Sequence, residues 1–111
     1  MPPEDLIRLR HMLDSANEAI QLIKNKKRED LDSDRLLNLA LVRLLEIVGE
    51  AASRTTNPTR AEYPEVPWSQ IISLRNRLIH GYDEVDLDIL WKILIKDLPQ
   101  LIDQLAQVNY P

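Results

Sequence analysis

The sequence predicts an all-α protein, an antiparallel bundle of four to five helices. The composition favours helices over strands, because glycine occurs only twice, phenylalanine is absent, and Leu, Ile, Glu, Lys and Arg are abundant. Long segments repeat their apolar residues in steps of three and four, which places these residues on one helix face. A chain of 111 residues usually folds around a single core, so residues 1–111 are predicted to form one domain.

The first helix is predicted to run from about residue 3 to residue 24. Pro3 is tolerated in a first turn, and the two acids that follow it suit the positive end of the helix dipole. The apolar face comprises Leu6, Leu9, Leu13, Ala16, Ile20 and Ile23. The basic run KNKKR, residues 24–28, has two interpretations: a solvated helix end, or a patch that contacts phosphate.

The second helix is predicted from about residue 34 to residue 54, with Ser33 or Asp34 as its N-cap. At roughly 100° per residue, its apolar residues cover about half of the circumference. This arc is wider than one surface helix needs, so the helix is expected to be central or to face a second subunit. The narrow polar side carries Arg43, Glu46, Glu50 and Ser53.

The rest of the chain is predicted to form a structured connection and two further helices. The segment TTNPTRAEYPEVP, residues 55–67, is punctuated by three prolines and is interpreted as an ordered connection. A third helix begins at Pro67 and ends near residue 79. A fourth begins after Asp86 as N-cap, and Pro99 is expected to kink it because proline lacks an amide donor.

Composition and charge exclude several classes of function. The chain has no cysteine, which excludes disulfides, thiolate metal sites and a cysteine nucleophile. A net charge of −4 argues against broad electrostatic capture of nucleic acid, although a local basic patch stays open. The N-terminus has acids where a signal peptide has bases, and no apolar run is long enough to span a membrane. A cytoplasmic protein without membrane association is expected.

Most candidates for chemistry lie in one stretch, SLRNRLIHGYDEVD, residues 73–86. On a helical wheel Arg75 projects from the middle of an apolar stripe, where an arginine is unfavourable unless it is paired. Asn76 and His80, four residues apart, share the adjacent polar face, and Arg77 lies beside them.

This stretch has a structural and a functional interpretation. In the structural one, Arg75 forms a buried salt bridge with Glu46 or Glu50, and His80 merely interacts with a helix end. In the functional one, the set cleaves RNA without a metal. Histidine can act as acid or base at neutral pH, and an arginine can bind two phosphate oxygens at once. An asparagine can orient the histidine or bind phosphate.

The functional interpretation also favours a dimer. A base must remove the 2′-OH proton, and an acid must protonate the leaving group. One histidine serves poorly as both at the same time. Two copies of the stretch facing one cleft would supply both roles.

The motif resembles a known family. Arg75-Asn76, three residues, then His80-Gly81-Tyr82 is similar to the R-x4-H-x-Y motif of HepT-like proteins of the HEPN superfamily. Further blocks resemble the same family in the same order, and together they cover most of the chain from the second helix onward. They read LLEIVGEAA (44–52), VPWSQIISLRNRLIHGYDEVD (66–86), ILW (89–91) and DLPQL (97–101).

The resemblance implies a dimeric four- to five-helix HEPN bundle and a metal-independent ribonuclease, the toxin of a type VII toxin–antitoxin pair, with no cofactor. It implies RNA as substrate and, as partner, an MntA-like minimal nucleotidyltransferase antitoxin that transfers AMP from ATP to the motif tyrosine. His80 would then be the acid/base, Arg75 the phosphate stabiliser and Asn76 the polar assistant. Arg77 fits a contact to RNA phosphate, and Tyr82 would accept AMP.

Two other functions are compatible with the sequence. The chain could be a non-catalytic HEPN partner that provides a docking and nucleotide-binding platform for the nucleotidyltransferase. It could also be a plain helical adaptor in which Arg75 forms a structural ion pair. The intact set of Arg75, Asn76 and His80 favours the enzyme, because a docking module has no need for it.

Overall fold

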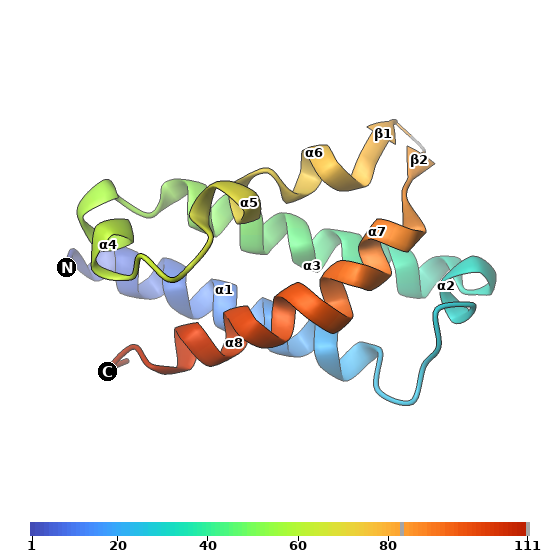
Figure 1. Ribbon diagram of the computed structural model, residues 1–111, viewed down its shortest axis with the longest axis horizontal. Helices are drawn as coiled ribbons and strands as arrows, with labels where there is room; N and C mark the ends of the chain where they lie inside the picture. Colours follow the sequence, from blue (N-terminus) through green and yellow to red (C-terminus); the bar gives the residue numbers. More distant parts are fainter. Residues whose placement is uncertain (83, 111) are drawn as a thin grey trace.

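The computed structural model describes residues 1–82 and 84–110 and shows the expected all-α bundle (Figure 1). The first long helix runs antiparallel both to the second long helix and to a long C-terminal helical segment, and shorter helices lie over the second long helix (Figure 1). The elements are α1 (Pro3–Leu22), α2 (Asp30–Ser33), α3 (Arg35–Arg54), α4 (Asn57–Glu62), α5 (Trp68–Ile72), α6 (Leu74–Leu78), β1 (Ile79–Gly81), β2 (Glu84–Val85), α7 (Leu87–Lys92), the π-helical turn η1 (Ile93–Asp97) and α8 (Leu98–Ala106).

Helix α3 is the centre of the fold, as its wide apolar arc predicted. It packs against α1 along its length and against α5 and α6 on another side. Asp34 is its N-cap, since the carboxylate accepts a hydrogen bond from the Leu37 amide at 3.0 Å. Part of the arc is not covered within the chain: Leu36 is 81% exposed, and Leu39 and Ala40 are also exposed.

The core is built mainly from α1, α3 and the C-terminal segment, with further side chains from α2 and α6. Its fully buried large side chains are Leu9, Met12, Leu31, Leu41, Leu45, Val48, Leu78, Leu90, Ile93, Leu94, Leu98 and Leu105. Gly49 lets α5 approach α3 closely, because a Cβ atom at this position would lie only 3.0 Å from the carbonyl oxygen of Ile71. A larger residue would push the helix that precedes the motif away from α3.

The basic run behaves as a solvated helix end at its lysines. Helix α1 ends at Leu22, and Asn25 adopts a left-handed backbone with φ 63°, which turns the chain. Lys24, Lys26 and Lys27 are exposed. Arg28 instead turns toward the fold, and its Nε lies 2.7 Å from Asp88 Oδ1 at the start of α7.

The prediction of one continuous third helix is wrong. It breaks at Ser73 into α5 and α6, and a short antiparallel hairpin, β1–β2, follows. The Ser73 hydroxyl donates to the Ser69 carbonyl at 2.9 Å, a back-bond that bends helices. The short helices α2 and α4 and the hairpin had no clear sequence signal, because each contains only a few residues.

The backbone hydrogen-bond pattern of the last helix changes just before Pro99. The turn before it widens into η1, and the chain then continues as α8 with Pro99 in its first turn. A wider turn relieves the crowding that the proline ring causes against the preceding carbonyls, so the helical segment continues. Within residues 1–82 and 84–110, no helix is long and apolar enough to cross a membrane.

Candidate active site

The motif lies on α6 and on the hairpin that follows it. In the hairpin, Ile79 pairs with Val85 and Gly81 pairs with Glu84, so β1 has one additional residue between its paired positions. That residue is His80. A bulge of this kind leaves its extra residue unpaired and redirects the side chain, a device common beside active sites.

Arg75 and Asn76 face α3. They line a groove of about 590 Å³ between α6 and α3. The other lining residues are Arg43, Leu45, Glu46, Gly49, Glu50, Ser53 and Ile72. The groove thus joins the polar side of α3 to the first half of the motif.

Arg75 is not buried, and this corrects the expectation from the helical wheel. Its side chain is 70% exposed, and its Nε lies 3.7 Å from Glu46 Oε2. The break at Ser73 explains the difference, because the wheel assumed one continuous helix through α5 and α6. Glu50, the other carboxylate considered as a partner, lies 2.9 Å from Arg54 Nε instead.

His80 faces a carboxylate that the sequence analysis treated only as a helix cap. Its Nε2 lies 3.6 Å from Asp86 Oδ2, and its side chain is half-exposed. The other Asp86 oxygen accepts a hydrogen bond from the Ile89 amide at 3.0 Å, which confirms Asp86 as the N-cap of α7. The Ile89 amide and His80 lower the pKa of the Asp86 carboxyl below its usual value, against a smaller opposing effect of desolvation.

Tyr82 lies just after β1, and its side chain is fully exposed. The other two tyrosines, Tyr63 and Tyr110, are half-buried. The Tyr110 hydroxyl donates to the Leu105 carbonyl at 2.9 Å, and burial raises the pKa of Tyr110 to about 12. Tyr82 is therefore the tyrosine most accessible to another protein.

Arg77 points away from the groove of Arg75. Its Nη2 lies 3.6 Å from Asp97 Oδ2 of η1, and the side chain lines a separate small cavity of about 70 Å³ between α5–α6 and the C-terminal segment. The structure therefore divides the predicted site. Arg75 and Asn76 share the α3 groove, His80 and Tyr82 lie on the hairpin, and Arg77 is apart from both.

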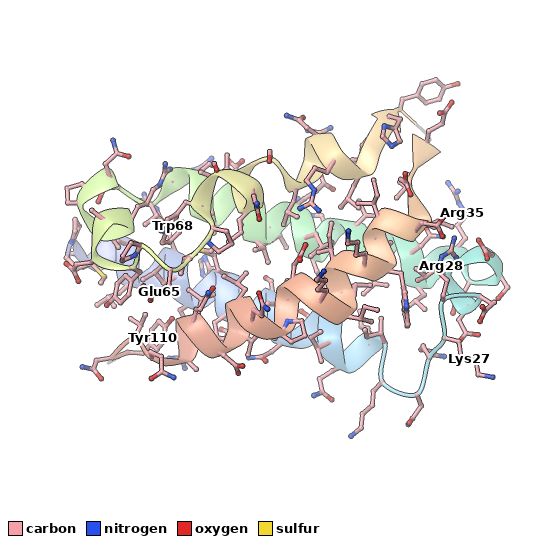
Figure 2. The ribbon with its side chains drawn as sticks, in the orientation of Figure 1. Lys27, Arg28, Arg35, Glu65, Trp68 and Tyr110 are labelled. Atoms are coloured by element: carbon pink, nitrogen blue, oxygen red, sulfur yellow. The ribbon has the colours of Figure 1, made fainter. Side chains whose placement is uncertain are left out.

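Basic side chains gather at the same end of the bundle as the hairpin. Lys27, Arg28 and Arg35 lie at this end, whereas Trp68 and Tyr110 lie at the opposite end (Figure 2). Acidic residues are interspersed, and Arg28 pairs with both Asp88 and Asp32. The described part of the chain contains no group of three or more His, Cys, Asp or Glu residues arranged to hold a metal ion.

The contact between Asp86 and His80 was not predicted from the sequence. The signal available was the spacing of the two residues within the motif stretch, but the capping role explained Asp86 without any function. The hairpin that brings the two side chains together was not predicted, and a continuous helix would not have suggested the contact.

Comparison with known proteins identifies the family. The model of the family described as "Ribonuclease HepT-like" matches residues 12–108. A protein of Methanocaldococcus jannaschii named as a putative RNase is 38% identical over 81% of this chain and 83% of its own length. A protein of Thermococcus cleftensis named "Probable ribonuclease HepT" is 39% identical over 80% of this chain and 84% of its own.

A third relative, named as a putative RNase of Caldanaerobacter subterraneus, is 35% identical over 90% of this chain and 89% of its own length. No solved structure matches the chain. The family match spans the α3 groove, the motif on α6 and the hairpin, and both segments of the C-terminal helix. The resemblance seen in the motif is thereby confirmed, and the chain belongs to the HepT-like ribonuclease family.

Proposed function

We propose that the protein is a metal-independent RNA endonuclease, the toxin of a type VII toxin–antitoxin pair, acting in the cytoplasm. The observation that carries the proposal is the exposure of Arg75, Asn76 and His80 on α6 and the bulged hairpin of a HepT-like chain. All three are polar side chains with access to solvent, which a substrate phosphate requires.

The cleavage is a transesterification within the RNA. His80 takes the proton from a 2′-OH, whose oxygen attacks the neighbouring phosphorus. The bond to the 5′-oxygen breaks, a second histidine returns a proton to that oxygen, and a 2′,3′-cyclic phosphate remains. Arg75 stabilises the charge on the pentacovalent phosphate, and Asn76 binds a phosphate oxygen or orients the histidine.

Arg75 is suited to this role because its present partner holds it weakly. The ion pair with Glu46 is 3.7 Å long, and its Arg75 side chain is largely exposed, so water and salt screen it. A phosphate with two charged oxygens can displace Glu46 by binding the guanidinium in a bidentate manner. Arg77 would have to give up its ion pair with Asp97 before it could bind an RNA phosphate. Its contact to RNA phosphate is proposed with this exchange of partners.

We propose a homodimer as the active form. Within one chain the α3 groove holds Arg75 and Asn76 but not His80, so a second copy is the natural source of the missing acid. The exposed Leu36, Leu39 and Ala40 on α3 supply an apolar surface for such a contact. Sedimentation of the protein at micromolar concentration tests this, and a monomer would contradict the shared cleft.

The off-switch is proposed to be AMP on Tyr82. An MntA-like minimal nucleotidyltransferase would direct the Tyr82 oxygen to the α-phosphorus of ATP, so that pyrophosphate leaves and the phenolic proton passes to solvent. The bound AMP adds bulk and a negative charge two residues from His80, which would repel a substrate phosphate. The full exposure of Tyr82 supports this acceptor.

Intact-mass measurement tests the acceptor. After incubation with the nucleotidyltransferase and ATP, the wild type should gain the mass of one AMP, and Tyr82→Phe should gain none. Tyr63→Phe serves as the matched control and should be modified like the wild type. Modification of Tyr82→Phe would show that the acceptor lies elsewhere.

A cleavage assay in the presence of EDTA tests the nuclease itself. Wild type should cut RNA, whereas Arg75→Ala and His80→Ala should not. His11→Ala, which removes the other exposed histidine, should retain activity. Equal activity in all four proteins would refute the nuclease. Binding of the nucleotidyltransferase by a chain that never cuts RNA would favour the docking platform instead.

A further inference from the structure

We propose that Asp86 is a positioning residue for His80: its carboxylate faces the Nε2–H group of the imidazole as a hydrogen-bond acceptor and thereby leaves Nδ1 as the nitrogen that takes the proton from RNA. The inference rests on the proposed nuclease function. The contact that carries it is the 3.6 Å approach of His80 Nε2 to Asp86 Oδ2 across the hairpin.

The carboxylate is held in place by three other bonds of the same residue. Oδ1 accepts from the Ile89 amide at 3.0 Å, and the Asp86 amide donates to the Leu78 carbonyl at 2.8 Å. The Asp86 carbonyl accepts from the Leu90 amide at 2.9 Å. Asp86 therefore connects the end of α6 to the start of α7, and Oδ2 is left to face the histidine.

His80 needs such a partner because its own backbone does not fix it. It is the extra residue of the bulge, and its side chain is half-exposed. An exposed side chain in an irregular turn can rotate about its side-chain torsions. One carboxylate fixed by a helix cap restricts the ring to orientations that keep Nε2 toward Asp86.

Among residues 73–82 and 84–86, the other charged side chains have different partners or are exposed. On α6, Arg75 is close to Glu46 and Arg77 is close to Asp97. On β2, Glu84 is exposed and packs beside Gly81. Among the described residues, Asp86 is the carboxylate that forms an ion-pair contact with the imidazole.

A neutral imidazole has a single N–H group, and the hydrogen bond of one nitrogen decides which tautomer is present. A carboxylate at Nε2 selects the Nε2–H form, in which Nδ1 has the free electron pair. The carboxylate also stabilises the imidazolium that forms once Nδ1 has taken the proton. Asp86 would thus act on the reaction through His80 and without touching RNA.

Asp86→Asn tests this role, because asparagine is as good an N-cap as aspartate but presents a neutral amide. The amide can donate to Nε2 and reverse the tautomer. We expect kcat for RNA cleavage to fall by roughly tenfold to a hundredfold, less than the roughly 10²–10⁴-fold that a general acid–base residue itself supplies, with little change in KM. The ¹⁵N spectrum of His80 should show Nε2–H in the wild type and a different tautomer in the variant.

Asp34→Asn is the matched control. Asp34 caps α3 through the Leu37 amide at 3.0 Å, just as Asp86 caps α7, but no histidine contact is recorded for it within the described chain. Both variants should have similar melting temperatures, and Asp34→Asn should keep the wild-type kcat. A wild-type kcat in Asp86→Asn, or Nδ1–H in the wild-type protein, would overturn the inference.

The experiment separates this inference from the proposed function. If the wild type cuts no RNA, the nuclease is refuted and the tautomer measurement alone decides the role of Asp86. A tautomer that changes in Asp86→Asn would then support the positioning role. An unchanged tautomer would refute it.

Discussion

The two ends of the bundle are built differently. At the end where the chain begins and finishes, short hydrogen bonds hold buried groups. At the hairpin end, three charged contacts of the motif region measure 3.6–3.7 Å and are partly exposed (Figure 1). The comparison indicates that one end supplies stability, whereas the long and partly exposed contacts of the motif region contribute little to it, as the proposed exchange of partners with a substrate requires.

Asp5 is the centre of the stabilising end. It is fully buried, and its carboxylate accepts hydrogen bonds from Thr59 Oγ1 at 2.6 Å, from the Thr56 hydroxyl and from the Thr56 amide. Arg8 lies 3.2 Å away and donates to the Arg54 carbonyl at 2.7 Å. This network ties α1 to the end of α3 and the start of α4, regions about fifty residues apart in sequence.

The largest expected effect is on activity at the hairpin end. His80→Gln should lower RNA cleavage by roughly 10²–10⁴-fold, the usual contribution of a general acid–base residue. Its melting temperature should match the wild type, because the side chain is half-exposed and its contact with Asp86 is long. Cleavage rates and thermal melts measured on the same samples check both statements. A large loss of stability would contradict the view that the hairpin end contributes little to stability.

The reciprocal change is Asp5→Asn at the stabilising end. It removes a charged acceptor from a buried network, which should lower the free energy of unfolding by about 1–3 kcal/mol. Cleavage of RNA well below the melting temperature should be unchanged. Urea unfolding followed by circular dichroism measures the loss. Asp14→Asn, an exposed carboxylate on the same helix, should be nearly neutral, and equal losses in both would contradict the role of the network.

The stability that Asp5 contributes should depend on pH. Burial raises the pKa of Asp5, but the hydrogen bonds from Thr56, Thr59 and Arg8 outweigh it and lower the pKa below the ordinary 3.8. The contribution of Asp5 is therefore fully present above that value and is lost as pH falls through the lower folded pKa. The difference in unfolding free energy between wild type and Asp5→Asn should shrink as the pH is lowered through this range. A difference that stays constant would contradict the assignment.

A smaller effect is expected at Trp68. Its indole N–H donates to the carbonyls of Arg60 and Tyr63, each at 3.1 Å, and holds the connection between α4 and α5. Trp68→Phe should lower the free energy of unfolding by about 1 kcal/mol beyond the change in Trp91→Phe. Trp91 is the matched control, because its indole makes no hydrogen bond within residues 1–82 and 84–110. Equal unfolding free energies for Trp68→Phe and Trp91→Phe would show that the hydrogen bonds of the Trp68 indole do not contribute to stability.

The smallest effect should come from Arg77→Gln at the hairpin end. Its ion pair with Asp97 is 3.6 Å long and partly exposed, so its loss should change the free energy of unfolding by less than about 1 kcal/mol. Binding of RNA should weaken if Arg77 contacts phosphate, with a smaller dependence of affinity on salt. Unchanged affinity and salt dependence would remove Arg77 from the proposed site.

The sequence by itself determined the long helices, two of their caps and the family. Asp86 was identifiable as a cap, and Asp34 was one of two candidates beside Ser33, because capping depends on residues only three apart. The apolar periodicity of α1 and α3 likewise depends on neighbours along one helix. The motif from Arg75 to Tyr82 was readable because its residues lie close together in the chain.

The tertiary structure decided how the motif is arranged. The break at Ser73, the bulge at His80 and the π-helical turn before Pro99 changed the direction of side chains that a continuous helix would have placed elsewhere. Arg75 is consequently exposed on a groove, Arg77 faces a different element, and Asp86 meets His80. The physical reason is that these contacts join separate elements, and their geometry depends on where each helix ends and not on the period within it.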